Sequence, residues 1–148
     1  MTQHGAETVD EAVPIGEAAR RSGVKVPTIR YYEQIGLLAA PARTEGNRRL
    51  YTGAELHRLA FVRHARELGF DVEAIRTLLT LQDRPEQPCG EADAIAKARL
   101  AEVRARIAKL KALEEELTRM IDECACGRVA DCRVIEILAE PHRHGALA

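Results

Sequence analysis

A long segment free of helix-breaking residues governs what the second half of the chain can fold into. Residues 91–124 contain no glycine or proline, so nothing in them interrupts a helix. Apolar side chains recur there at alternating spacings of three and four, interrupted only by Glu114: Leu100, Val103, Ile107, Leu110, Leu117 and Ile121. Such a helix is roughly 50 Å long and too exposed to be stable alone. The pattern predicts a coiled coil, most simply with the same helix of a second copy, and therefore a homodimer.

The composition favours helices and places positive charge towards the N-terminus. Of 148 residues, 46% are hydrophobic and 3% aromatic, so a core has to be built mainly from Leu, Ile, Val and Ala. The net charge of −1 conceals an asymmetry, because residues 14–51 hold seven Lys or Arg against three Glu. We expect this basic part to be the surface that binds nucleic acid.

Several classes of protein are disfavoured. No apolar run reaches the about 18 residues of a membrane span, and the polar start lacks the pattern of a signal peptide. We therefore expect a cytoplasmic protein with no membrane partner. Ser22 is the single serine, there is no glycine-rich phosphate loop, and no Cys/His dyad lies outside the cysteine-rich loop. The sequence thus argues against an enzyme.

Two short helices are predicted after a polar tail. Residues 15–22 form the first, which ends at Gly23. The second begins at Val26, with Pro27 in the first turn where its missing N–H costs nothing, and ends at Gly36. Two such helices about four residues apart indicate a helix-turn-helix.

A basic hairpin is predicted next, over residues 41–51. Gly46 and Asn47 supply the positive φ angles of a tight turn between two short extended arms. The hairpin carries three arginines, which make it a basic wing: Arg43, Arg48 and Arg49. Together with the helix-turn-helix it predicts a mainly α winged-helix head.

Two further helices and a hinge complete the predicted layout. Thr52 and Glu55 have the spacing of a capping box, and Asp71 caps a shorter helix that ends near Leu81. Pro85 and Pro88 then exclude a helix over residues 83–89. The predicted parts are a disordered tail (1–13), a winged-helix DNA-binding domain (14–82), a hinge (83–90), a coiled-coil dimerisation helix (91–124), a metal-binding loop with a short helix (124–140) and a tail (141–148).

The cysteines point to soft-metal chemistry. In a reducing compartment, thiols are more often metal or redox ligands than disulfide partners. Cys124, Cys126 and Cys132 crowd into nine residues after the long helix. Thiolates suit Cu(I), Zn(II), Cd(II), Hg(II) and Pb(II), whereas Mg(II) and Ca(II) prefer carboxylates. Gly127 gives the loop enough slack for Cys124 and Cys132 to reach one ion, although inert buried cysteines remain the alternative.

The head motifs carry a resemblance to a known family. Thr28-Ile-Arg-Tyr-Tyr-Glu33, Gly36-Leu-Leu38 and Asn47-Arg-Arg-Leu-Tyr51 resemble the MerR family of transcription regulators. The long helix, cysteine loop and short apolar helix resemble its heavy-metal-responsive branch, of the zinc, cadmium, lead and mercury type. The resemblance implies a homodimer joined by an antiparallel coiled coil. It also implies binding to promoter DNA with an over-long spacer, which the dimer distorts for RNA polymerase when metal binds.

Candidate DNA contacts lie on the second helix and the wing. Arg30 can donate two hydrogen bonds to guanine or phosphate, and Tyr31 or Tyr32 can reach the backbone. The resemblance carries over Arg30, Tyr32 and Arg49 as contacts, while Arg43 and Arg48 add charge to the wing. The alternative is that these are ordinary solvated arginines and a core tyrosine.

The position of Cys89 shapes the expected metal site. Cys89 precedes Cys124 by 124 − 89 = 35 residues, so along one helix the two lie roughly 50 Å apart. In an antiparallel dimer, Cys89 of one chain instead meets Cys124, Cys126 and Cys132 of its partner, which gives two intersubunit sites. A third thiolate favours a soft divalent ion (Zn, Cd, Pb or Hg) over Cu(I). A hinge thiol that binds nothing is the alternative.

Further ligands and rival functions remain open. His142 and His144 are possible additional ligands, although a solvated tail is the simpler interpretation. The expected function is a regulator that activates a metal efflux or resistance promoter. The alternatives are a Cu(I)-responsive regulator of the same family, an iron–sulfur redox sensor, or a metal-storage protein. The iron–sulfur pattern would require a ligand at position 121, which is Ile121.

Overall fold

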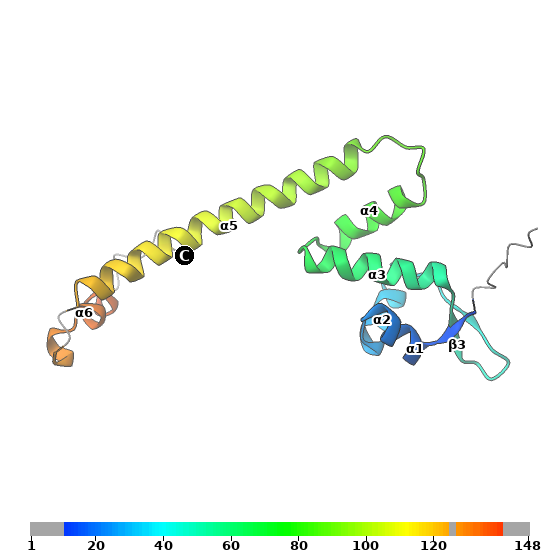
Figure 1. Cartoon of the computed structure of the whole chain (residues 1–148), viewed down its shortest axis with the longest axis horizontal. Coiled ribbons are helices and arrows are strands. Elements are labelled where there is room, and N and C mark those ends of the chain that lie inside the picture. Colours follow the sequence, from blue (N-terminus) through cyan, green and yellow to red (C-terminus); the bar gives the residue numbers. More distant parts are fainter. Residues whose placement is uncertain (1–10, 125–126, 141–148) are drawn as a thin grey trace, which may run out of the picture. The chain divides into compact units, whose positions relative to one another are not determined.

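The computed structural model describes residues 11–124 and 127–140. The chain divides into two compact units, Met1–Ile95 and Ala96–Ala148, and each is described by itself. In the first unit the elements are β1 (Val13–Pro14), α1 (Ile15–Ser22), α2 (Val26–Gln34), β2 (Ala42–Arg43), β3 (Arg49–Tyr51), α3 (Gly53–Glu67) and α4 (Val72–Gln82). Figure 1 shows these helices beside the small sheet. The fold is mainly helical, as predicted.

The predicted helix boundaries in the head are confirmed. Gly23 follows α1 with a φ of 71°, a left-handed conformation that favours glycine. At the start of α3, the Glu55 backbone N–H donates to Thr52 Oγ1 and the Thr52 N–H donates to Glu55 Oε2 at 2.6 Å, which is the expected capping box. Asp71 caps α4 by accepting from the Ala74 N–H at 2.8 Å. These caps end and begin the helices where the sequence places them.

The wing is a three-stranded antiparallel sheet with strand order β1–β3–β2. Asn47 has a φ of 62° and its N–H donates to the Thr44 carbonyl at 2.8 Å, so the tight turn is present. The positive φ angle expected at Gly46 is wrong, because Asn47 alone of the two adopts the left-handed conformation. Val13 departs from the expected disordered tail, because it is 7% exposed and pairs with Tyr51. A two-residue strand is too short to give a periodic signal, so the sequence pattern could not reveal it.

The core of the first unit is aliphatic, with one fully buried tyrosine. Its largest fully buried side chains are Tyr51, Ile29, Leu37, Leu59, Ile75, Leu79 and Val62. Burial of each aliphatic side chain contributes about 1.5–3 kcal/mol. Because these residues come from α2, α3, α4, β3 and the segment after α2, the core ties the helix-turn-helix to the wing.

Arginines of α3 and α4 complete this packing by donating to backbone carbonyls at the ends of α1 and α2. A helix leaves its last carbonyls without partners within the helix. The donations are Arg63 to Ser22 at 3.5 Å, Arg76 to Ile35 at 2.8 Å and Arg58 to Leu37 at 3.2 Å. Side chains of the two following helices thus hold the helix-turn-helix in place.

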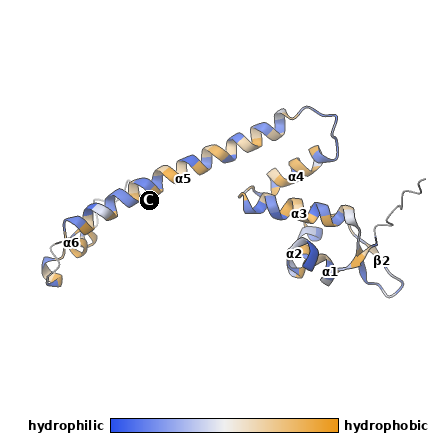
Figure 2. Cartoon of the chain, in the orientation of Figure 1, coloured by the Kyte–Doolittle hydropathy of each residue, from blue (hydrophilic) through white to orange (hydrophobic). Residues whose placement is uncertain are grey.

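The long predicted helix is present as α5 (Gly90–Asp122), followed by the 3-10 turn η1 (Val129–Asp131) and by α6 (Arg133–Ala139). Figure 2 shows apolar residues recurring along α5. In the single chain Met120 is buried, while six other large apolar side chains of α5 are solvent-exposed: Leu100, Ile107, Leu110, Leu113, Leu117 and Ile121. The short apolar helix expected at residues 134–138 is confirmed as α6. In the part of the chain that the structure describes, every helix is too short or too polar to span a membrane.

Candidate functional site

The second helix of the helix-turn-helix, α2, presents the predicted contact residues unequally. Arg30 is exposed and Tyr31 is 49% exposed, so both side chains are accessible to a ligand. Tyr32 is 7% exposed and belongs to the core. Its ring centroid lies 6.1 Å from that of Tyr31. Tyr32 therefore packs in the core beside Tyr31, and its expected contact with the DNA backbone stays a prediction.

The wing arginines differ in their partners. Arg43 and Arg49 lie directly opposite each other on β2 and β3, and like charges in this position destabilise a strand pair. Arg43 Nη1 donates to Asn47 Oδ1 at 3.0 Å, while Arg49 Nε lies 3.1 Å from Glu33 Oε2. Arg48 is exposed at the tip. Arg43 and Arg48 are thus both exposed to solvent, while Arg49 is partly buried against Glu33.

A junction between α2 and β3 forms around Glu33. Its carboxylate accepts a hydrogen bond from the Tyr51 hydroxyl and contacts Arg49. The Glu33 side chain is 9% exposed, so its charge depends on these partners. Burial, together with the hydrogen bond to Glu33, raises the pKa of Tyr51 well above its ordinary value. The predicted contact residue Arg49 is therefore held by a cluster around Glu33 that no spacing in the sequence signals.

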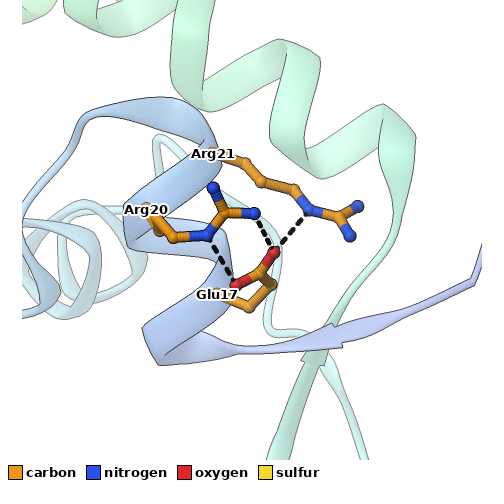
Figure 3. Close-up of polar contacts among 3 residues, drawn as sticks. All are labelled: Glu17, Arg20 and Arg21. Atoms are coloured by element: carbon orange, nitrogen blue, oxygen red, sulfur yellow. Dashed lines mark hydrogen bonds and ion pairs between the residues drawn. The ribbon is translucent and has the colours of Figure 1, made fainter.

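A second cluster lies on α1. Figure 3 shows Arg20 and Arg21 converging on Glu17, with Arg20 Nε donating to Glu17 Oε2 and Arg21 Nε to Glu17 Oε1, both at 2.9 Å. Hydrogen bonds from Arg20 and then Arg21 lower the pKa of Glu17 to about 2. The three- and four-residue spacing on a helix signals this cluster in the sequence. Arg20 and Arg21 add basic side chains to the helix-turn-helix that the predicted set lacked.

The structure brings two of the predicted thiol ligands together. Cys124 ends the turn after α5 and Cys132 is the residue before α6, and their Sγ atoms lie 3.8 Å apart. Both are partly buried and free. Glu123 and Arg133, their immediate neighbours, form an ion pair of 3.1 Å between the two helices. Charge pairing beside the thiols therefore closes the loop and holds the sulfurs within reach of one ion.

Of the remaining predicted ligands, Cys89 alone lies among the described residues. Cys89 is exposed and immediately precedes α5. Cys126, His142 and His144 lie outside the described residues. Over residues 11–124 and 127–140, no group of three or more His, Cys, Asp and Glu side chains lies close enough to hold a metal ion. The described part of one chain thus supplies a two-thiol site.

Comparison with known proteins finds relatives that match most of the chain. The sequence matches the family descriptions "MerR HTH family regulatory protein" over residues 13–82 and "MerR, DNA binding" over residues 56–120. The HTH-type transcriptional regulator ZntR of Escherichia coli (strain K12) is 45% identical over 130 residues, which are 85% of this chain and 92% of that protein.

Two solved structures are also similar. The transcription regulator PbrR691 of Ralstonia metallidurans CH34, in complex with lead(II), is 41% identical with a TM-score of 0.74 and covers 85% of this chain and 98% of its own. MerR of Bacillus megaterium MB1, in complex with mercury(II), is 30% identical with a TM-score of 0.66. The match covers 86% of this chain and 100% of that MerR chain. With its helix-turn-helix, basic wing and long helix matched throughout, the chain belongs to the MerR family of helix-turn-helix transcription regulators.

Proposed function

We propose that this protein is a metal-responsive regulator that binds promoter DNA as a homodimer and activates a metal efflux or resistance promoter when a soft divalent ion binds. Residues 14–82 bind DNA, residues 91–124 join two copies, and residues 124–140 bind metal. The observation that carries the proposal is the 3.8 Å separation of Cys124 and Cys132 Sγ in the loop after α5. The lead and mercury complexes of the two similar proteins support the same class of ion.

The thiol separation fits a three- or four-coordinate ion. Two sulfurs that each lie about 2.3 Å from a tetrahedral ion are about 3.8 Å apart. If the same two sulfurs lie on opposite sides of a linear ion, their separation is about 4.6 Å. The 3.8 Å separation of the metal-free thiols is compatible with the first arrangement. Thiolates also select soft ions over Mg(II) and Ca(II). The chemistry of this donor pair therefore favours Zn(II), Cd(II), Pb(II) or Hg(II) over two-coordinate Cu(I).

A divalent ion needs at least one more ligand than the pair supplies. In an antiparallel dimer, Cys89 of the partner chain would provide it, since the start of one stalk then lies against the end of the other. Cys126, His142 and His144 are further candidates. The exposure of Cys89 suits such a contact, because a thiol that serves a second chain has to be accessible.

On the DNA side, the proposed contacts are Arg30 and Tyr31 of α2 and the wing arginines Arg43, Arg48 and Arg49. Arg30 would read a base edge or bind phosphate, and the wing would bind phosphates. Their accessibility and charge support this assignment. RNA polymerase at the same promoter is the partner that an activator requires.

The test is a promoter-reporter strain challenged with each metal in turn, comparing the parent with Cys89→Ser. We expect a response to divalent soft ions that Cys89→Ser weakens by at least tenfold in the metal concentration required. A response to Cu(I) or Ag(I) alone would replace the divalent assignment with the Cu(I) alternative. A brown protein on anaerobic purification would support the iron–sulfur alternative.

A further inference from the structure

Arg58, on α3, contacts two segments that the sequence keeps well apart. Its Nε donates to the Leu37 carbonyl at 3.2 Å, just beyond α2. Its Nη1 donates to both carboxylate oxygens of Asp83, at 3.1 and 3.2 Å. Leu37 is 1% exposed and belongs to the core, whereas Asp83 is the first residue of the hinge. One guanidinium therefore connects the segment after α2 to the start of the hinge.

Arg58 lines a surface hollow together with the two segments that it joins. The hollow, of about 540 Å³, lies between the segment after α2, the first turns of α3 and the end of α4, and Leu37, Arg58 and Asp83 all line it. Leu37 also meets α4 through the aliphatic core, which contains Leu79. The guanidinium adds a polar connection from Leu37 to Asp83 at the solvent-accessible side of that core.

Arg76 provides an internal comparison. It also donates to a carbonyl at the end of α2, that of Ile35, at 2.8 Å. Its ionic partner is Glu73, on its own helix, at 3.6 Å, so it makes no contact with the hinge among the interactions of the described residues. Arg58 and Arg76 therefore both donate to backbone carbonyls of the segment after α2 and differ in the tie to Asp83.

We propose that Arg58 is a positioning residue that transmits the state of the hinge to the recognition helix. The inference rests on the proposed function, in which metal is bound through Cys89, six residues after Asp83. Metal that fixes Cys89 restricts the hinge, and the Asp83 carboxylate then holds or releases the guanidinium that supports the Leu37 carbonyl. In this coupling, the support of α2 differs between the metal-free and the metal-bound state of the hinge.

The test compares Asp83→Ala, Arg58→Met and Arg76→Met in the full-length protein. Each variant is measured for metal affinity, for DNA affinity in the apo state, and for the ratio of transcription with and without metal. Asp83→Ala should keep metal and DNA affinity while the induction ratio falls about two- to fivefold, the range expected for a partly exposed ion pair. Asp83→Glu should recover part of the ratio. Arg58→Met should lose at least as much as Asp83→Ala.

The control separates coupling from general support of α2. Arg76→Met should lower thermal stability without lowering the induction ratio. Two results would overturn the role of Arg58 and leave the proposed function intact. One is an equal loss of induction in Arg76→Met, and the other is a parental induction ratio in Asp83→Ala. A parent that responds to no thiophilic metal would overturn the proposed function and the coupling with it.

Discussion

Charge at the wing is arranged residue by residue. Arg43 and Arg49 face each other across two strands, and each is stabilised by a different partner, Asn47 for the first and Glu33 for the second. Arg48 projects from the tip with its side chain exposed. Arg48 is therefore available to a phosphate at no structural cost, whereas Arg49 also supports the buried Glu33 carboxylate.

Arg48→Ala and Arg49→Ala should consequently differ. Each should reduce the slope of log affinity against log salt by about 0.9, the loss of one phosphate contact, with a similar effect on all operator variants. Arg49→Ala should also lower the free energy of unfolding by about 1–3 kcal/mol, because it leaves Glu33 with one partner fewer. Salt-dependent DNA binding and urea denaturation measure the two effects. An unchanged salt slope in both variants would contradict the assignment of the wing.

Tyr51 predicts a pH dependence of stability. Its pKa is raised in the folded state by burial and by Glu33, so its contribution is fully present below the unfolded pKa of about 10 and is lost as the pH rises above that value. Tyr51→Phe should cost about 1 kcal/mol at pH 7 and should flatten the alkaline decline. Urea midpoints between pH 8 and pH 11 test this, with the exposed Tyr31→Phe as the control. A parental decline in Tyr51→Phe would contradict it.

At the level of elements, local signals were sufficient to predict the helices. Thr52, Glu55 and Asp71 act as the caps that their spacing predicts, and α5 follows from the absence of glycine and proline. The pairing of Cys124 with Cys132 was also predictable, since a short loop brings them together. Strand β1 and the contacts of Glu33 with Arg49 and Tyr51 were not predictable, because they join residues distant in sequence and give no periodic pattern.

The exposed apolar residues of α5 predict a dimer interface. Leu110 and Leu117 are 59% and 48% exposed in one chain, and burial of each against a partner helix would contribute about 1.5–3 kcal/mol. Replacing both with Lys should abolish the dimer and, with it, DNA binding. Sedimentation measures this. Ala105→Lys with Ala112→Lys, on the opposite side of the helix, should leave the dimer intact, and an intact dimer in the Leu variant would mean that the interface lies elsewhere.

At the level of the whole molecule, the proposed metal site would combine thiols of two copies. One chain supplies two thiols 3.8 Å apart and an exposed thiol at Cys89, immediately before α5. Because a helix of this length is roughly 50 Å long, we propose that the third sulfur comes from a second chain. The homodimer would then be required for metal binding as well as for DNA binding.

Mixed dimers distinguish sites built between chains from sites built within one. In a dimer of Cys89→Ser with a Cys124→Ser/Cys132→Ser chain, the intact loop faces the intact Cys89 of its partner, so one site of parental affinity should remain. In a dimer of the parent with a chain carrying all three substitutions, the intact loop faces a partner without the Cys89 thiol, and affinity should fall to that of the Cys89→Ser homodimer. Sites within one chain predict the reverse in both cases. Metal titration of the two mixed dimers, purified through different tags, therefore decides the arrangement.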